Sequence, residues 1–504
     1  MPKSSQPPRP KKRRNHTGSI VVLLIIIALL IAGIAGMIYL CINITSAPVK
    51  VERNDSFISA MLGMLNKQVE NIPDISIPNS TSAPSTEPPT EPPTEPETEP
   101  PTTMPEPEHV VATATISSTG DVLMHMPVVN SGLRSGGVYD FEPIFRYVKE
   151  YTSAADLALA NLETTLCGTD NGYSYSGFPN FNCPDEIVDG LADAGFDILL
   201  TANNHSYDTG LVGYKRTIET VRDRGLGNLG TMLTAEEPKY LVQNVNGINI
   251  GMVCYTYATS VSADGRPSLN GMPQISEQGL CNYFTYDNLP RFYEEVESYI
   301  AGMRDSGAEA IVLYIHWGAE YVTFVRDQER AIAQKLCDLG VDVIIGGHPH
   351  VIEPIELLTS ETDPEHKTVV LYSMGNAVSN QRLGNLSMIN TAHTEDGILF
   401  NITFSKYSDN TVYLESVDVI PCWVYLRNNK SPVEYNILPL DTSTEDQWIE
   451  KYDLSQTTFN AAKLSYNRTM DIVGQGLEAS QEYLAAQKEQ READYLAAVM
   501  APAA

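Results

Sequence analysis

Five apolar runs of four to six residues are each followed at once by Asp, Glu, Asn or His. The five stretches are TISSTGDVLMH (115–125), LALANLETT (157–165), DILLTANNHSYDTG (197–210), IVLYIHWGAEY (311–321) and VDVIIGGHPHV (341–351). Short continuous apolar runs are typical of strands that are buried on both faces of a sheet. In an open α/β sheet the carboxyl ends of such strands line one crevice. We therefore expect the polar residues of all five stretches to meet at one edge of a sheet.

Helix-like stretches separate several of these strands. They are VDGLADAGF (188–196), YKRTIETVRDRG (214–225), FYEEVESYIAGMRDSG (292–307) and QERAIAQKLCDLG (328–340). Strands that alternate with helices predict a layered α/β fold. Two further strand-like runs, 397–406 and 412–424, have no helix between them. That pair favours an antiparallel edge or a second sheet.

The first 110 residues predict a membrane anchor and a stalk. Residues 20–42 form an unbroken apolar run, long enough to span a bilayer of roughly 30 Å. The basic tail at 1–19 predicts a cytoplasmic N-terminus and hence a single-pass protein whose main part is extracytoplasmic. A cleaved signal peptide has a shorter apolar region of about 7–15 residues, so an uncleaved anchor is favoured over cleavage near residues 46–47. The Pro/Thr/Glu-rich segment within 43–110 predicts an extended, disordered stalk.

The remaining chain divides into a folded domain at 111–425 and a polar, partly helical extension at 426–504. The net charge of −30 disfavours binding to nucleic acid, because an acidic surface repels phosphate. The six cysteines beyond the apolar run are widely spaced and include no CxxC pair, so no zinc-ribbon pattern is present.

Six residues at the ends of the predicted strands are of metal-ligand type: Asp121, Glu163, Asn204, His316, His348 and His350. Their carboxylate, amide and imidazole groups suit one or two divalent ions such as Mn, Fe, Zn or Mg. The pair in GGHPHV carries the most information, since two His at i and i+2 can share one side, while the two glycines allow close backbone approach. Each motif alone also fits a purely structural role.

The stretch TANNHSYDTG adds two catalytic candidates, His205 and Asp208. A His beside a metal-type Asn can serve as a general acid or hold an oxyanion. The same residues also fit an Asn-rich helix cap, in which no catalysis is involved.

The motifs GDVLMH, NLETTL, TANNHSYDTG, IHWGAEY, GGHPHV and YSMGNAVSN, in this order, resemble the CapA family of poly-γ-glutamate capsule synthesis proteins. The resemblance covers about residues 113–380 and extends toward 425. It implies a fold like the calcineurin-like metallophosphoesterases, a layered sandwich of mixed sheets flanked by helices.

The resemblance also implies residue roles. Asp121 matches the first ligand, Glu163 the bridging ligand, Asn204 and His316 further ligands, and His348 and His350 the last two, with His205 as proton donor. One position departs from the superfamily, because Leu123 stands where a ligand His is usual and His125 lies two residues further on. Candidate substrate contacts are His125, Asn161, Asn203, Glu320, Tyr372, Ser373 and Asn376.

Three functions follow as expectations. The first is a membrane-anchored, metal-dependent hydrolase or transferase in the synthesis or export of an anionic cell-envelope polymer, acting on the polymer or its precursor together with capsule-synthesis subunits. The second is a non-catalytic, polymer-binding scaffold of an export complex, which Leu123 favours. The third is a secreted phosphatase or nucleotidase, which would use the same ligand types.

Overall fold

The computed structural model describes residues 109–170, 172–385 and 390–500. Within these ranges the chain forms a mixed α/β fold whose helices and strands belong to one compact unit. No helix in this part of the chain combines the length and apolar character that crossing a bilayer requires. The predicted anchor at 20–42 and the predicted stalk up to residue 108 lie outside the described residues.

The first sheet is built around β1 (Val110–Val122), which runs parallel to β2 (Leu157–Leu162) and antiparallel to β15 (Asp396–Tyr407). Its strand order is β17-β16-β15-β1-β2-β3-β4, and β14 pairs with the end of β1. The other strands are β3 (Ile198–Leu200), β4 (Gly227–Leu229), β14 (Asn376–Val378), β16 (Val412–Arg427) and β17 (Glu434–Pro439). The antiparallel pairing of β15 and β16 confirms the expectation for the two runs without an intervening helix.

The second sheet has the order β12-β13-β11-β10-β6-β5, with β9 beside β6. Its parallel centre is formed by β6 (Ile248–Tyr257), β10 (Ala310–His316), β11 (Val343–Gly347) and β13 (Lys367–Met374). The flanking strands are β5 (Leu241–Val245), β9 (Tyr283–Phe284) and β12 (Ile352–Thr359). A separate short pair consists of β7 (Ser260–Val261) and β8 (Pro267–Ser268).

The two sheets share one apolar core, because alternate residues of both contribute to the same buried cluster. Ile116 and Leu159 enter it from the first sheet, and Val312 and Ile345 from the second. One polar contact crosses this core, a 3.0 Å hydrogen bond between the hydroxyls of Ser118 and Tyr314.

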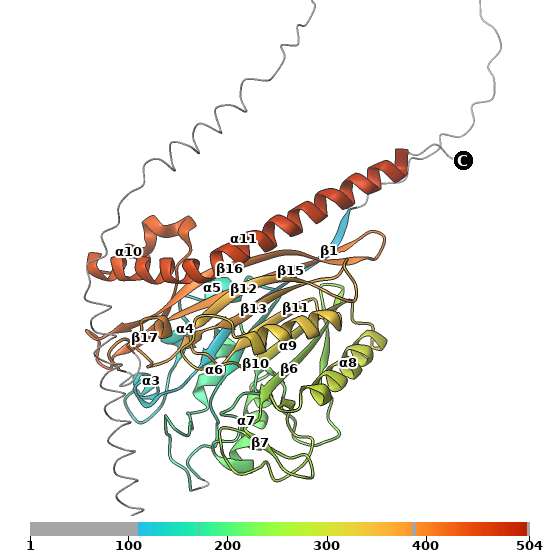
Figure 1. The fold of residues 1–504 in the computed structure, drawn as a ribbon. Helices are drawn as coiled ribbons and strands as arrows, with labels where there is room; N and C mark the ends of the chain where they lie inside the picture. The colour runs from blue at the N-terminus through green and yellow to red at the C-terminus, as the bar shows by residue number, and fades with distance from the viewer. Residues whose placement is uncertain (1–108, 171, 386–389, 501–504) are drawn as a thin grey trace, which may run out of the picture. The chain divides into compact units, whose positions relative to one another are not determined.

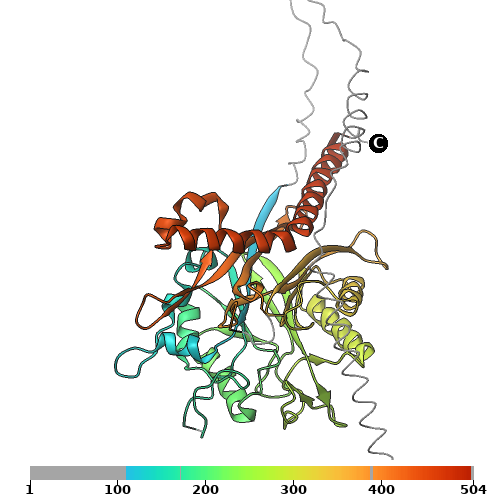
Figure 2. The same ribbon diagram turned by 60° about the vertical axis from the view of Figure 1, so that its left-hand side comes forward.

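Helices cover the two outer faces (Figures 1 and 2). Helices from the first half of the fold pack on the outside of the first sheet, and two later helices pack on the outside of the second. The first set is α3 (Met126–Gly132), α4 (Glu142–Phe145), α5 (Lys149–Thr152) and α6 (Glu186–Asp193), and the second is α8 (Leu289–Asp305) and α9 (Asp327–Asp338). Helix α7 (Gly210–Asp223) contributes Val221 to the first outer layer and Tyr214 and Ile218 to the shared core.

The segment 426–504 contributes to these layers. β17 is the edge strand of the first sheet, and the short helix α10 (Trp448–Lys451) follows it. The long helix α11 (Gln456–Met500) packs against β12, β15 and β16 and buries Leu477 and Leu484 (Figure 1). A Cβ added to Gly476 would lie 1.8 Å from the Ile355 carbonyl oxygen, so the helix backbone touches the sheet directly.

Strand register determines where the polar strand ends meet. In the first sheet Asp121 pairs with Asn161 across β1 and β2. In the second sheet His316 pairs with Gly347 across β10 and β11. Parallel strands that end at the same level bring side chains from distant parts of the sequence together at one rim.

Candidate metal centre

The six predicted metal-type residues lie together at the carboxyl ends of strands from both sheets. Asp121 belongs to the end of β1, Glu163 follows β2, and His316 ends β10. Asn204 follows β3, and both His348 and His350 follow β11. All six side chains are buried.

Two groups of ligand atoms share one carboxylate. The first group is Asp121, Glu163 and His350, and the second is Glu163, His316 and His348, with the ligand atoms of each group within 4.8 Å of one another. Glu163 Oε1 lies 3.4 Å from His316 Nε2, and Glu163 Oε2 lies 4.0 Å from His350 Nδ1. Glu163 is therefore placed to bridge two neighbouring ions.

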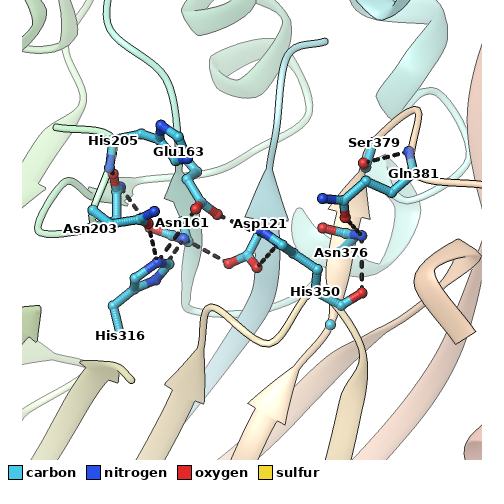
Figure 3. Close-up of polar contacts among 12 residues, drawn as sticks. Asp121, Asn161, Glu163, Asn203, His205, His316, His350, Asn376, Ser379 and Gln381 are labelled. Atoms are coloured by element: carbon cyan, nitrogen blue, oxygen red, sulfur yellow. Dashed lines mark hydrogen bonds and ion pairs between the residues drawn. The ribbon is translucent and has the colours of Figure 1, made fainter. Parts of the chain in front are cut away.

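Amide side chains orient these ligands (Figure 3). Asn161 Nδ2 donates to Asp121 Oδ1 at 2.7 Å, and Asn203 Nδ2 donates to Asn161 Oδ1 at 3.1 Å. Asn204 Oδ1 lies 2.8 Å from His316 Nε2, so these two ligand atoms converge on one point. Asn161 and Asn203 were predicted as substrate contacts. Both are buried, and their amide groups form hydrogen bonds inside the site, so in the structure they position other side chains.

The loop after β11 holds its two imidazoles in an unusual backbone conformation. His348 has φ 98° and His350 has φ 56°, both in the region that disfavours residues with a Cβ. Strain of this kind costs on the order of 1–3 kcal/mol per residue and concentrates at functional sites. Gly346 is needed just before them, since an added Cβ would lie 1.9 Å from the Tyr372 carbonyl oxygen.

The charges of the two groups shift the pKa values in opposite directions. Burial alone would lower the pKa of His350, but the Glu163 charge and the 3.0 Å hydrogen bond with Asp121 raise it to about 9. Burial and the charges of neighbouring imidazoles hold the pKa of His348 well below its usual value. Burial would raise the pKa of Asp121, but His350, His316 and Asn161 together lower it. Metal ligation requires neutral imidazoles and ionised carboxylates. His348 and Asp121 are shifted toward these forms, whereas His350 must release its proton when an ion binds.

The predicted catalytic pair forms a hydrogen-bonded dyad. His205 Nδ1 lies 2.7 Å from Asp208 Oδ2, and the same carboxylate oxygen accepts the backbone N–H of Phe181. A carboxylate on Nδ1 fixes the ring orientation and leaves Nε2 as the nitrogen that is open to exchange a proton.

His125 lies beside this dyad and outside both ligand groups. Its ring meets the edge of Phe181 at 5.2 Å, and Phe181 in turn meets His205 at 4.7 Å. Its Nδ1 lies 3.5 Å from Ser379 Oγ, and burial with the charge of His350 lowers its pKa to about 4. Among the described residues, neither ligand group includes His125, so the place of Leu123 is not filled by this imidazole.

The other candidate substrate contacts fall in different places. Glu320 is exposed on the loop after β10. Ser373 Oγ donates to the Val351 carbonyl oxygen, and Asn376 Nδ2 donates to the His350 carbonyl oxygen, so both support the histidine loop (Figure 3 shows Asn376). Tyr372 points away from the site, because it packs in the outer layer and its hydroxyl donates to Glu356. Alternation along β13 explains this, since neighbouring residues face opposite sides of the sheet.

Two tyrosines that the sequence did not indicate border the site. The Tyr257 ring lies 4.9 Å from His348, and the Tyr321 ring lies 6.1 Å from His350. Tyr321 has φ 64°, and its hydroxyl accepts from Gln381 Nε2 at 3.0 Å. Both rings are half-buried, which places them where the centre meets the surface.

The residues present fit a divalent metal centre. Both carboxylate oxygens of Glu163 and Nδ1 of His348 are buried without a hydrogen-bond partner. Buried polar atoms without a partner are costly, so such atoms indicate an unfilled ligand role. The donor set of carboxylates, imidazoles and one amide suits one or two ions of the Mn, Fe, Zn or Mg type.

The fold and the site define an α/β protein with a buried, carboxylate-bridged ligand cluster at a sheet rim. The chain belongs to the bacterial capsule synthesis protein PGA_cap family, whose model matches residues 115–381.

Two Bacillus proteins that are named for capsule biosynthesis are similar to this chain. The chain is 30% identical to the PGA biosynthesis protein CapA of Bacillus subtilis over 53% of this chain and 63% of that protein. It is 26% identical to the capsule biosynthesis protein CapA of Bacillus anthracis over 69% of this chain and 78% of that protein. A crystal structure named for a 5′-nucleotidase from Staphylococcus aureus overlaps 61% of this chain and 54% of its own, with 15% identity and a TM-score of 0.36. A TM-score this low does not define a shared fold.

Proposed function

We propose that this protein is a divalent-metal-dependent hydrolase or transferase that acts on an anionic capsule-type polymer, such as poly-γ-glutamate, or on its precursor. The observation that carries the proposal is Glu163, a buried carboxylate with no hydrogen-bond partner that belongs to both ligand groups. Membership of the capsule synthesis family supports the substrate class. In this proposal the fold would hold a catalytic metal centre at its strand ends, as the fold of metallophosphoesterases does.

The chain's own residues supply the steps around the metal. Asp121, Glu163 and His350 would hold one ion, and Glu163, Asn204, His316 and His348 the other. Bound divalent ions would supply positive charge that polarises an ester or amide oxygen and makes a water molecule more acidic. His205, held by Asp208, would deliver a proton from Nε2 to the leaving group. Both ester and amide cleavage fit this arrangement.

We also propose the cellular setting from the sequence. Residues 20–42 would anchor the protein in the cell membrane with the N-terminus in the cytoplasm, and the predicted stalk that precedes β1 would hold the domain away from the bilayer. An envelope polymer and capsule-synthesis subunits would then be within reach of the site.

A non-catalytic polymer-binding scaffold is the second candidate, and Leu123 favours it. With Leu123 in place of a His, the first group has three protein ligands and Asp121 lacks an imidazole neighbour on its own strand. A general phosphatase or nucleotidase is a third candidate, since it would use the same ligands with different pocket walls.

Turnover and metal dependence separate these candidates. We expect the purified full chain with Mn²⁺ to hydrolyse bis-p-nitrophenyl phosphate, and to lose this activity on chelation and in Glu163→Ala and His348→Ala variants. A protein that binds a capsule polymer but shows no turnover with any divalent ion would support the scaffold. Turnover that chelation and both variants leave unchanged would defeat the metal-dependent enzyme.

A further inference from the structure

A pocket of about 480 Å³ lies at the carboxyl ends of β6 and β9. Since β6 is parallel to β10, whose last residue is His316, this pocket opens on the same rim as the ligand cluster. Its lining includes Tyr257, Thr259, Thr285, Tyr286, Asn288 and Arg291.

Tyr257 connects the pocket to the metal centre, and Tyr286 connects it to the loop that follows β10. Tyr257 lines the pocket, and its ring centroid lies 4.9 Å from that of His348. Tyr286 OH accepts the backbone N–H of Gly318, two residues after His316, at 2.8 Å. A ligand held at the centre that extends past Tyr257 therefore enters this pocket.

Arg291 is the one cationic side chain on the pocket lining. Its guanidinium lies 4.7 Å from the Tyr283 ring centroid and donates from Nη1 to the Tyr283 hydroxyl, while Glu295 lies 3.8 Å from Nη2. A guanidinium has five N–H donors, so donors remain free for a ligand. Asp287 also lines the pocket, so an anionic group is favoured where it reaches Arg291 and not elsewhere.

We propose that this pocket is a substrate subsite in which Arg291 binds an oxyanion, a carboxylate or a phosphate, on the part of the substrate beyond the reacting bond. A planar guanidinium pairs with either anion through two parallel hydrogen bonds. The hydroxyl and amide groups of Thr259, Thr285 and Asn288 would accommodate the polar chain that links this anion to the metal-bound end. The subsite rests on the proposed function and assigns it a determinant of substrate choice.

The test is equilibrium binding to the Mn²⁺-loaded full chain in detergent, measured by calorimetry. The probes are a γ-linked glutamate tetramer, the same tetramer with α-carboxamides in place of carboxylates, and a glycerol phosphate dimer. We expect the wild type to prefer the anionic tetramer over its amide by about tenfold or more. Arg291→Gln should remove this preference, and Arg291→Lys should retain part of it.

Arg222→Gln is the matched control. Arg222 lies on α7, is about as exposed as Arg291 and is paired with Glu237. Its loss changes the net charge equally without touching the pocket. Unfolding temperature and Mn²⁺ content, compared with the wild type, establish that each variant is folded and loaded. An Arg291-dependent preference for glycerol phosphate alone would assign the oxyanion to a phosphate polymer.

Three results would overturn the subsite: no preference for either anionic probe in the wild type, an unchanged preference in Arg291→Gln, or an equal loss in Arg222→Gln. Binding does not require turnover. A catalytically inactive protein that keeps the Arg291-dependent preference would therefore refute the hydrolase and leave the subsite standing, whereas an active enzyme without it would refute the subsite alone.

Discussion

Replacing Glu163 by Gln tests the bridging role of this side chain. The substitution keeps the shape of the side chain and removes one negative charge that both ligand groups share. We therefore expect Glu163→Gln to weaken both ions at once. Asp121→Asn should weaken the first ion alone, and His348→Gln the second alone, because each of these residues belongs to one group.

The size of the effect follows from linkage. A ligand at 100 times its dissociation constant stabilises the folded state by about 2.7 kcal/mol, so two ions contribute about 5 kcal/mol. The folded part spans roughly 390 residues, and at about 2.1 cal/mol/K of unfolding entropy per residue this corresponds to a rise of about 6–7 °C in Tm. Glu163→Gln should show almost none of this rise.

The measurement combines metal content with thermal unfolding. The full chain and the three variants are stripped with a chelator, titrated with Mn²⁺, analysed by mass spectrometry for bound metal and melted at each concentration. The wild type should hold two ions, the single-group variants one each, and Glu163→Gln none tightly. A Glu163→Gln protein that binds two ions, or one whose metal-induced rise in Tm equals that of the wild type, would refute the bridging geometry.

Three further predictions address catalysis, packing and pH. His205→Ala should lower kcat for bis-p-nitrophenyl phosphate by about 10²–10⁴-fold, and an unchanged kcat would remove it as proton donor. Gly476→Ala should lower the free energy of unfolding by about 1–3 kcal/mol in urea, because its Cβ would meet the Ile355 carbonyl oxygen at 1.8 Å. The control Gly474→Ala should be neutral or stabilising, since the nearest neighbour of its Cβ lies at 3.8 Å. Equal effects of the two substitutions would contradict the packing of α11. Burial and the neighbouring carboxylate of Glu329 on α9 raise the pKa of Glu353 to about 8. The folded state therefore favours protonated Glu353, and this stabilisation is fully present below about pH 4.5 and is lost as the pH rises to about 8. Glu353→Gln should therefore match the wild type near pH 4.5 and exceed it at pH 8 by on the order of 3 kcal/mol in urea unfolding, and a difference independent of pH would contradict this.

The sequence located the strand ends well because the local pattern of apolar and polar residues is enough to predict where a buried strand ends. A buried strand needs consecutive apolar residues, and the residue that follows is the first that can be polar without cost. Asp121, His316 and the His348–His350 pair were found in this way, and their order along the chain also carried the family resemblance.

Long-range packing decided the parts that the sequence left open. His125 was a candidate contact from its nearness to Asp121 in the chain, yet its neighbours Phe181 and Ser379 come from loops that no local pattern connects. The pocket around Arg291 likewise depends on a strand order in which β9 joins β6. The sequence predicted only a polar, partly helical extension at 426–504, whereas in the structure β17 joins the first sheet and α11 buries Leu477 and Leu484.

The sequence by itself determined which residue types stand at the strand ends, since a short stretch of chain is enough to predict a buried strand and to identify the metal-ligand residues that follow it. The tertiary structure alone decided that Glu163 belongs to two groups, that Tyr257 and Tyr321 border them and that Tyr372 faces away. The physical reason is that strand register within each sheet, and the packing of the two sheets on each other, set the distances between these side chains. Register depends on the packing of the whole core, which no single stretch of the chain encodes.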